Sequence, residues 1–139
     1  MSMNRKEFLS TLGLGAAAIA CSYCFGGCES NDQVVTPPVV DFTLDLNDPA
    51  NAALKTNGGS LYKEGVIVAR TSAGDYIAAS ATCTHAAGTV QYVASGNRFY
   101  CPNHGSDFGP TGAVINGPAS QALEAYHISL NSTSLRVYT

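Results

Sequence analysis

The sequence has little charge and no concentrated patch of positive charge. Only 12% of its 139 residues are charged, the formal net charge is −3, and no run of Lys or Arg occurs. A nucleic-acid-binding surface needs cations that neutralise phosphates, so we expect no nucleic-acid partner. The length leaves little room for a second core beside one domain and an N-terminal appendage, which excludes a large multidomain enzyme.

Long stretches of helix-forming residues are missing after the first thirty residues. Gly is frequent instead, with 14 copies, and β-branched residues and Tyr recur in short runs. This composition is typical of a small β protein, so we expect an all-β fold, an antiparallel sandwich or barrel. Alternating or apolar runs bounded by turn sequences predict strands at 39–46, 65–70, 76–80, 89–93, 98–100, 123–128 and 135–138.

The N-terminus has the pattern of an export signal. Arg5 and Lys6 stand just before an apolar stretch that runs from residue 8 to residue 25. This order of charge and apolar sequence is what a translocation machinery recognises. The segment resembles a twin-arginine signal in which Lys6 stands in place of the second Arg, and an ordinary secretory signal is the alternative.

The end of this apolar stretch predicts a membrane tether. The residues Phe-Gly-Gly-Cys at 25–28 resemble a lipobox, in which Cys28 would be acylated. An uncleaved membrane anchor and a cleaved, discarded signal are the alternatives. The spacing of Cys21, Cys24 and Cys28 also fits a metal site, but a signal region has no fixed fold to hold three sulfurs.

These patterns divide the chain into three parts. We expect an export signal or membrane anchor at residues 1–28, a linker at 29–38 that ends in two prolines, and one folded domain at 39–139. The domain would then lie in the periplasm or another extracytoplasmic space, tethered to a membrane by the N-terminal segment or its lipid.

Two cysteine–histidine pairs stand in predicted loops at 83–88 and 101–110. Cys83 and His85 are separated by one residue, fifteen residues follow, and Cys101 and His104 are separated by two. Each loop therefore offers one thiolate and one imidazole, and loops at the same end of a hairpin can close around a shared metal group. Three glycines would let the backbone approach that group: Gly88, Gly105 and Gly109.

Together with Gly105-Ser106 and the Gly-Pro-Ala sequence at 117–119, these motifs resemble a Rieske iron–sulfur domain over residues 39–139. The resemblance implies one [2Fe–2S] cluster per subunit, with thiolates on the inner iron and imidazoles on the outer iron. It further implies that the 117–119 loop covers the cluster and that Ser106 donates a hydrogen bond to its sulfur. The implied metal ligands are Cys83, His85, Cys101 and His104.

Other readings of these residues are simpler. Cys83 and Cys101 could be buried apolar thiols or, after export, a disulfide. A Cys2His2 zinc site would use the same donors. Structural zinc sites usually group like ligands in sequence, whereas each loop here mixes Cys with His, which favours iron–sulfur. His127, the third histidine, lies in a predicted strand and is expected to be structural or exposed.

The sequence also departs from the family pattern. High-potential Rieske proteins brace the cluster with a disulfide, and the matching positions here are Gly88 and Asn103. Those proteins also tend to place a Tyr hydroxyl near a ligand sulfur, where this chain has Phe108. Fewer hydrogen bonds to sulfur stabilise the reduced state less, so the resemblance implies a lower reduction potential.

The implied function is one-electron transfer to or from a redox partner, a cytochrome or an oxidoreductase subunit, rather than stand-alone catalysis. A ferredoxin-like component of an oxygenase is one alternative, which the missing disulfide suits and the export signal does not. A zinc-stabilised interaction module is another. An oxygenase itself is disfavoured because its two-His-one-carboxylate site needs further histidines, and only His127 is spare.

Overall fold

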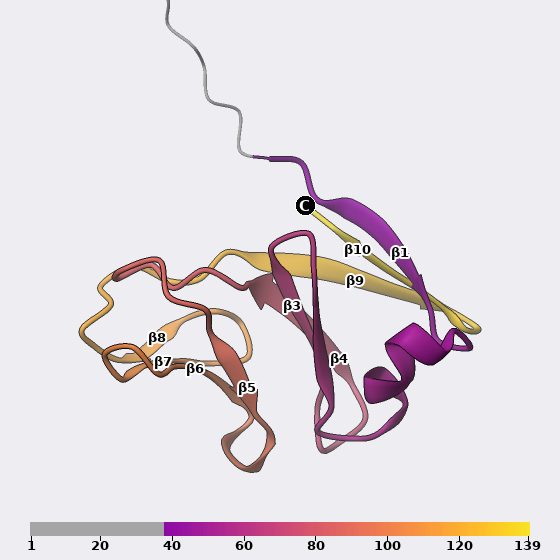
Figure 1. The fold of residues 1–139 in the computed structure, drawn as a ribbon, viewed down its shortest axis with the longest axis horizontal. Coiled ribbons are helices and arrows are strands. Elements are labelled where there is room, and N and C mark those ends of the chain that lie inside the picture. The colour runs from indigo at the N-terminus through magenta and orange to yellow at the C-terminus, as the bar shows by residue number, and fades with distance from the viewer. Residues whose placement is uncertain (1–37) are drawn as a thin grey trace, which may run out of the picture. The chain divides into compact units, whose positions relative to one another are not determined.

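The computed structural model describes residues 38–139, which hold ten β-strands and two short 3-10 helices (Figure 1). The predicted signal at 1–28 and the predicted acylation site Cys28 lie outside the described residues. Within the described part, no helix is long and apolar enough to cross a membrane.

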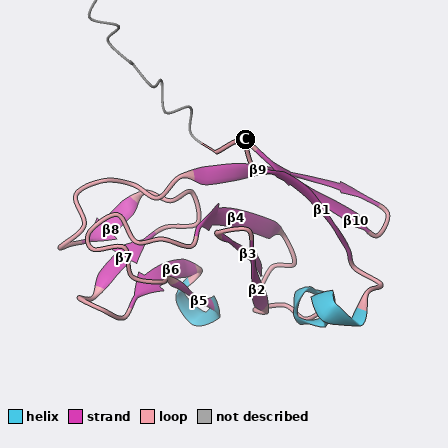
Figure 2. Ribbon diagram, turned by 45° about the horizontal axis from the view of Figure 1, so that its top comes forward, coloured by secondary structure: helices cyan, strands magenta, loops and turns pink. Residues whose placement is uncertain are grey.

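Six strands form one antiparallel sheet in the order β1-β10-β9-β4-β3-β2. The first of the two helices, η1 (Pro49–Lys55), connects β1 to β2 and is one of the cyan turns in Figure 2. Asp48 caps this helix by accepting a hydrogen bond from the N–H of Ala50 at 2.9 Å. The strands are β1 (Asp41–Asp45), β2 (Ser60–Lys63), β3 (Val66–Arg70), β4 (Tyr76–Ser80), β9 (Ala125–Asn131) and β10 (Ser134–Tyr138).

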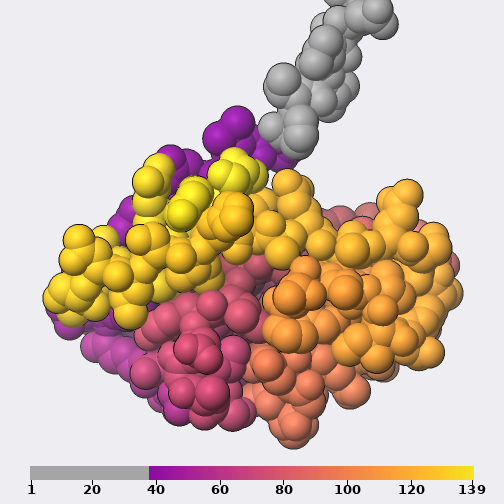
Figure 3. Space-filling model, turned by 180° about the vertical axis from the view of Figure 1, so that it is seen from behind, coloured from indigo at the N-terminus to yellow at the C-terminus, as the bar shows by residue number. Residues whose placement is uncertain are grey.

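The other four strands form a second antiparallel sheet in the order β5-β6-β7-β8. Its residues, coloured orange, gather in a lobe beside the magenta residues of β3 and β4 in the space-filling view (Figure 3). The helix η2 (Ala94–Gly96) makes the turn between β5 and β6. The strands are β5 (Gln91–Val93), β6 (Arg98–Cys101), β7 (Ser106–Phe108) and β8 (Val114–Asn116).

The strand β3 lies between two hydrophobic cores. Val66 and Val68 point into a core formed with β1, β10 and η1, whereas Ile67 points into the core that contains Cys83 and Cys101. Side chains alternate between the two faces of a strand, so a strand covered on both faces carries a continuous apolar run. The centre of β3 therefore connects the core formed by β1, β10 and η1 to the core beneath the loops that carry the candidate metal ligands.

The all-β prediction is confirmed, and each of the seven predicted runs overlaps a strand. Three strands and η1 were not predicted, and the predicted loop at 101–110 is wrong because it contains β7. β7 and β8 have only three residues each, and β8 is exposed throughout. Strands of three residues are too short to show the apolar alternation that makes a strand recognisable in sequence.

Candidate metal centre

The first candidate loop, residues 83–88, lies between β4 and β5. The N–H of Cys83 donates to the Gly88 carbonyl at 2.7 Å, and the N–H of Ala87 donates to the Cys83 carbonyl at 3.0 Å. Just outside the loop, Thr82 and Thr89 form an isolated antiparallel bridge. The loop is therefore closed on itself at its base, with Cys83 buried and His85 exposed.

The second candidate loop is the turn of a hairpin. Cys101 ends β6 and pairs with Ser106, which begins β7, so only four residues separate the two strands. The N–H of Gly105 donates to the Cys101 carbonyl at 3.0 Å, and Gly105 has a φ of 83°, a left-handed conformation that favours glycine. The hairpin buries Cys101 and exposes His104 at its tip.

The two loops bring their like ligands together in pairs. Cys83 and Cys101 are both free thiols, 3% and 2% exposed, and they lie close enough for each to shift the pKa of the other. The rings of His85 and His104 meet edge to face, with their centroids 4.8 Å apart and their planes at 84°. The centre thus has a buried sulfur side and an exposed imidazole side.

Backbone N–H groups point at the Cys83 sulfur. Burial acts to raise the pKa of the Cys83 thiol, but donation from the N–H groups of His85 and Ala86 opposes it. The Cys101 thiol and the Ser106 hydroxyl also donate to this sulfur, and the pKa of Cys83 therefore lies below its ordinary value. An environment of this kind favours a thiolate, the form that binds metals.

The Cys101 thiol has the opposite shift. Burial and the neighbouring Cys83 hold the pKa of Cys101 above its ordinary value, against donation from the N–H groups of Asn103 and His104. Two thiolates side by side repel each other, so the first proton leaves more easily than the second. A cation between the sulfurs would remove this repulsion.

Gly88 lies where the two loops touch. A Cβ added to Gly88 would lie 2.5 Å from Nδ2 of Asn103 and 3.2 Å from the Cys101 sulfur. The two positions at which the related high-potential proteins were expected to carry a disulfide therefore face each other here. Gly88 is therefore tightly enclosed by the second loop, whereas a Cβ on Gly109 would meet no atom closer than 3.8 Å.

A further segment, residues 117–121, is tied to both loops, and we call it the covering segment. The N–H of Ala119 donates to Oγ of Ser106 at 3.0 Å, and the Thr84 hydroxyl donates to the Gln121 carbonyl at 2.6 Å. Ala119 is 4% exposed and packs in the same core as the two cysteines. The sequence patterns did not single out Thr84, because a hydrogen bond to a carbonyl 37 residues away leaves no local motif.

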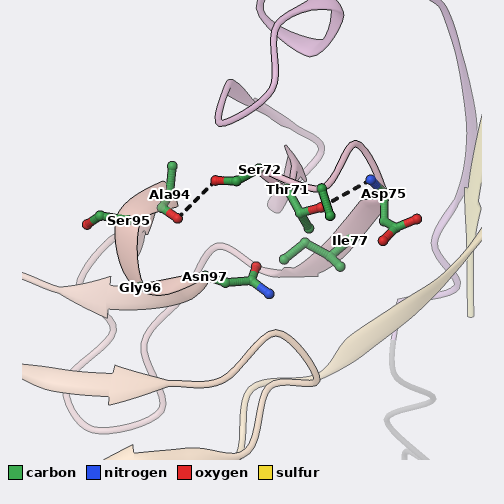
Figure 4. Close-up of a pocket in the computed structure, with 9 residues that line it drawn as sticks. Thr71, Ser72, Asp75, Ile77, Ala94, Ser95, Gly96 and Asn97 are labelled. Carbon is green, nitrogen blue, oxygen red and sulfur yellow. Dashed lines mark hydrogen bonds between the residues drawn. The ribbon is translucent and has the colours of Figure 1, made fainter.

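A separate hollow of about 520 Å³ lies between the turn after β3 and the helix η2 (Figure 4). The Ser72 hydroxyl donates to the Ala94 carbonyl at 3.3 Å, and Oγ of Thr71 accepts from the N–H of Asp75 at 3.1 Å. None of the four candidate ligands lines this hollow, so it is not part of the metal centre.

The donors fit a two-iron cluster better than a single ion. A structural zinc ion takes four ligands at one centre, whereas a Rieske cluster takes two thiolates on one iron and two imidazoles on the other. The observed pairs, two thiols and two imidazoles, match the second arrangement.

Comparison with known proteins decides the family. The family model described as Rieske [2Fe-2S] domain matches residues 40–127. The chain belongs to the Rieske [2Fe-2S] family. The cytochrome b6-f complex iron-sulfur subunit of Synechococcus elongatus is 42% identical to this Rieske protein over 147 aligned residues, covering 93% of the chain and 80% of the relative.

Solved structures agree with the Rieske assignment. The plasma membrane Rieske protein PetC3 from Synechocystis PCC 6803 superposes with a TM-score of 0.54 and 30% identity, over 63% of this chain and 93% of that one. The ferredoxin of carbazole 1,9a-dioxygenase from Nocardioides aromaticivorans IC177 gives 0.51 and 26%, over 59% and 86%. The predictions of a [2Fe–2S] cofactor and of one-electron transfer are confirmed by the family.

His127 is the histidine outside the motif. It is exposed on β9, and its ring lies 5.4 Å from the ring of Tyr138 on β10. The expectation that this histidine is structural or exposed agrees with its position.

Proposed function

We propose that Cys83 and Cys101 hold the inner iron of the cluster and that His85 and His104 hold the outer iron. The observation that carries this assignment is the pairing of two buried thiols beneath two exposed imidazoles at 4.8 Å. When bound, the cluster supplies a one-electron redox couple. The sulfur side is shielded from water by the core, and the imidazole side offers a short path to a partner.

The reduction potential of this protein lies in the lower half of the Rieske range of roughly −150 to +300 mV. Phe108 is fully buried beside the cysteines and has no hydroxyl to donate to sulfur. A Cβ at Gly88 would meet Asn103, but the two residues form no covalent brace. Ser106 supplies the remaining side-chain hydroxyl donor. Protein-film voltammetry that gives a value near the top of the range would contradict this proposal.

The N-terminal residues 1–28 export the domain, which then lies in an extracytoplasmic space, tethered to a membrane through the segment or a lipid on Cys28. Residues 29–38 act as the linker to the domain at 39–139. The related PetC3 protein is named as a plasma membrane Rieske protein, which supports such a location. Cys28→Ala should release the protein from membranes if the lipid is the tether, without loss of the cluster.

The redox partner is a cytochrome-containing membrane complex. A relative that is 42% identical is named as the iron-sulfur subunit of the cytochrome b6-f complex, and the aligned region covers 93% of this chain. We therefore propose that this protein acts as the iron–sulfur subunit of a complex of that class. Co-purification of cytochrome subunits with the membrane-bound chain tests the assembly, and isolation of the chain alone from gently solubilised membranes would contradict it.

Spectroscopy of purified variants tests the ligand assignment. The wild-type chain should contain iron and acid-labile sulfide and, when reduced, give a low-temperature EPR signal with the low average g value of Rieske clusters. His104→Ala and Cys101→Ser should abolish that signal. His127→Ala is the matched control and should keep it, because this side chain lies outside the two loops. A full signal in either ligand variant would refute the assignment.

A further inference from the structure

The covering segment is fastened at two points, one on each ligand loop. Thr84 lies between the candidate ligands Cys83 and His85, and its hydroxyl donates to the Gln121 carbonyl at 2.6 Å. Two residues earlier in the segment, the N–H of Ala119 donates to Oγ of Ser106 at 3.0 Å. The hydrogen bond of Thr84 is exposed to solvent, whereas that of Ser106 is fully buried.

The Ser106 hydroxyl takes part in two hydrogen bonds in series. It accepts from the N–H of Ala119 at 3.0 Å, and its own O–H is one of the donors that lower the pKa of the Cys83 thiol. A hydroxyl that accepts a hydrogen bond becomes a stronger donor, because chained hydrogen bonds polarise one another. The position of Ala119 therefore determines how strongly Ser106 donates to the sulfur, and hence how well the more negative, reduced state is stabilised.

We propose that Thr84 is a positioning residue that holds the covering segment so that Ala119 can act on the Cys83 sulfur through Ser106, and thereby raises the reduction potential. This inference rests on the ligand assignment of the proposed function. The hydrogen bond of Thr84 ends on Gln121, so its influence passes through the covering segment.

A second effect of the covering segment would have the opposite sign. If the segment moved away, water would approach the centre, and water also stabilises the more negative state. Loss of the Thr84 hydroxyl would then raise the potential. The hydrogen-bond route predicts a lower potential instead, because Ser106 is fully buried and no water replaces the Ala119 N–H while the core stays closed.

Voltammetry on a set of matched variants of the full chain tests the proposal. Thr84→Val keeps the side-chain shape and removes the hydroxyl, and Thr84→Ser keeps the hydroxyl. Thr89→Val is the control, because the hydroxyl of Thr89 has no hydrogen-bond partner within the described range 38–139. We expect Thr84→Val to shift the one-electron equilibrium at least threefold toward the oxidised form, about 28 mV at about 59 mV per tenfold change.

A double-mutant cycle separates the two routes. If Thr84 acts through Ser106, adding Thr84→Val to Ser106→Ala should cause no further shift, because the route is already broken. Hydrogen exchange of the peptide that contains residues 117–124 should also be faster in Thr84→Val than in wild type. Thr84→Ser and Thr89→Val should match wild type in both measurements.

Three results would overturn the inference. The first is a reduction potential of Thr84→Val equal to that of Thr89→Val, and the second is a higher potential in Thr84→Val than in wild type. The third is a shift caused by Thr84→Val that is as large in the Ser106→Ala variant as in the wild-type chain. Failure of the ligand assignment itself is distinguishable, because the wild-type chain would then lack the Rieske EPR signal. If Thr84→Val does not retain iron, hydrogen exchange decides, and unchanged exchange at 117–124 would contradict the proposal.

Discussion

At the scale of single residues, the two cysteines of the centre differ in what donates to them. The Cys83 sulfur accepts from the Ser106 hydroxyl as well as from backbone N–H groups. The Cys101 sulfur accepts hydrogen bonds from backbone N–H groups. Burial, and then the neighbouring Cys83 sulfur, raise the pKa of Cys101. The chain can therefore tune the centre through one side chain, Ser106, without changing a ligand.

Ser106→Ala should lower the reduction potential. The hydroxyl donates to the Cys83 sulfur, and a hydrogen bond that is about 1 kcal/mol stronger in the reduced state corresponds to about 40 mV. Voltammetry measures the shift, with the exposed Ser95→Ala as control. An unchanged potential in Ser106→Ala would show that this hydroxyl does not act on the sulfur.

Phe108→Tyr should raise the reduction potential. Phe108 is fully buried in the core that contains both cysteines, so a hydroxyl placed there lacks water and would gain from donating to sulfur. The expected rise is again about 40 mV for one hydrogen bond. If thermal stability falls and the potential stays constant, the hydroxyl points away from the cluster.

The candidate ligands could be predicted from sequence because their spacing is local to two short loops. Cys83 and His85 are separated by one residue and Cys101 and His104 by two. Such short spacings can be recognised in the sequence without knowledge of the fold. The N–H donors to sulfur could not be predicted, since every residue has a backbone N–H and only the loop conformation aims it. The hydrogen bond from Thr84 also depends on tertiary structure.

At the scale of elements, strands with buried alternating or continuous apolar runs were recognisable. β3 and β4 begin and end within one residue of their predicted ranges. β7 was missed because its central residue faces outward and only Ser106 and Phe108 are buried, which is too little for a pattern. Yet β7 positions the second loop, since its pairing with β6 forms the hairpin that presents His104.

Gly88→Ala should impair cluster binding by forcing the two loops apart. The new Cβ would lie 2.5 Å from Nδ2 of Asn103, which can rotate away, and 3.2 Å from the Cys101 sulfur, which cannot move once it binds iron. Such overpacking costs about 1–3 kcal/mol. Iron and sulfide analysis should show reduced content in this variant.

Gly109→Ala is the matched control for this prediction. An added Cβ at Gly109 would meet no atom closer than 3.8 Å, an ordinary contact distance. This variant should keep the wild-type iron content. Equal content in both glycine variants would mean that the contact between the loops does not limit cluster binding.

At the scale of the whole described domain, β3 lies between the core formed with β1, β10 and η1 and the core that contains the two cysteines. Its adjacent residues Ile67 and Val68 are both fully buried, but they point into different cores. Tyr62 on β2 adds a second connection, since its hydroxyl donates to the carbonyl of Val90, just after the first loop, at 2.8 Å. Loss of packing on one face of β3 should therefore also destabilise the core on its other face.

Val68→Ala tests this coupling, because Val68 faces away from the cysteines. Removal of two buried methyl groups costs roughly 2 kcal/mol, which lowers the apparent midpoint of thermal unfolding by roughly 8–16 °C. Far-UV circular dichroism and the visible absorbance of the cluster should shift together. Val39→Ala, at a residue 81% exposed, should shift neither.

Separate transitions in Val68→Ala would show that the two cores unfold independently. In that case the cluster absorbance would persist while the circular dichroism of the frame is lost.

The central claim is that two loops, each with one Cys and one His, bind a two-iron cluster through Cys83, His85, Cys101 and His104. The most direct test is low-temperature EPR of the reduced wild-type chain, combined with iron and acid-labile sulfide analysis of the same sample. We predict two irons and two sulfides per chain with the low average g value of a Rieske centre. Zinc, or no metal, in an anaerobically purified sample would contradict the account.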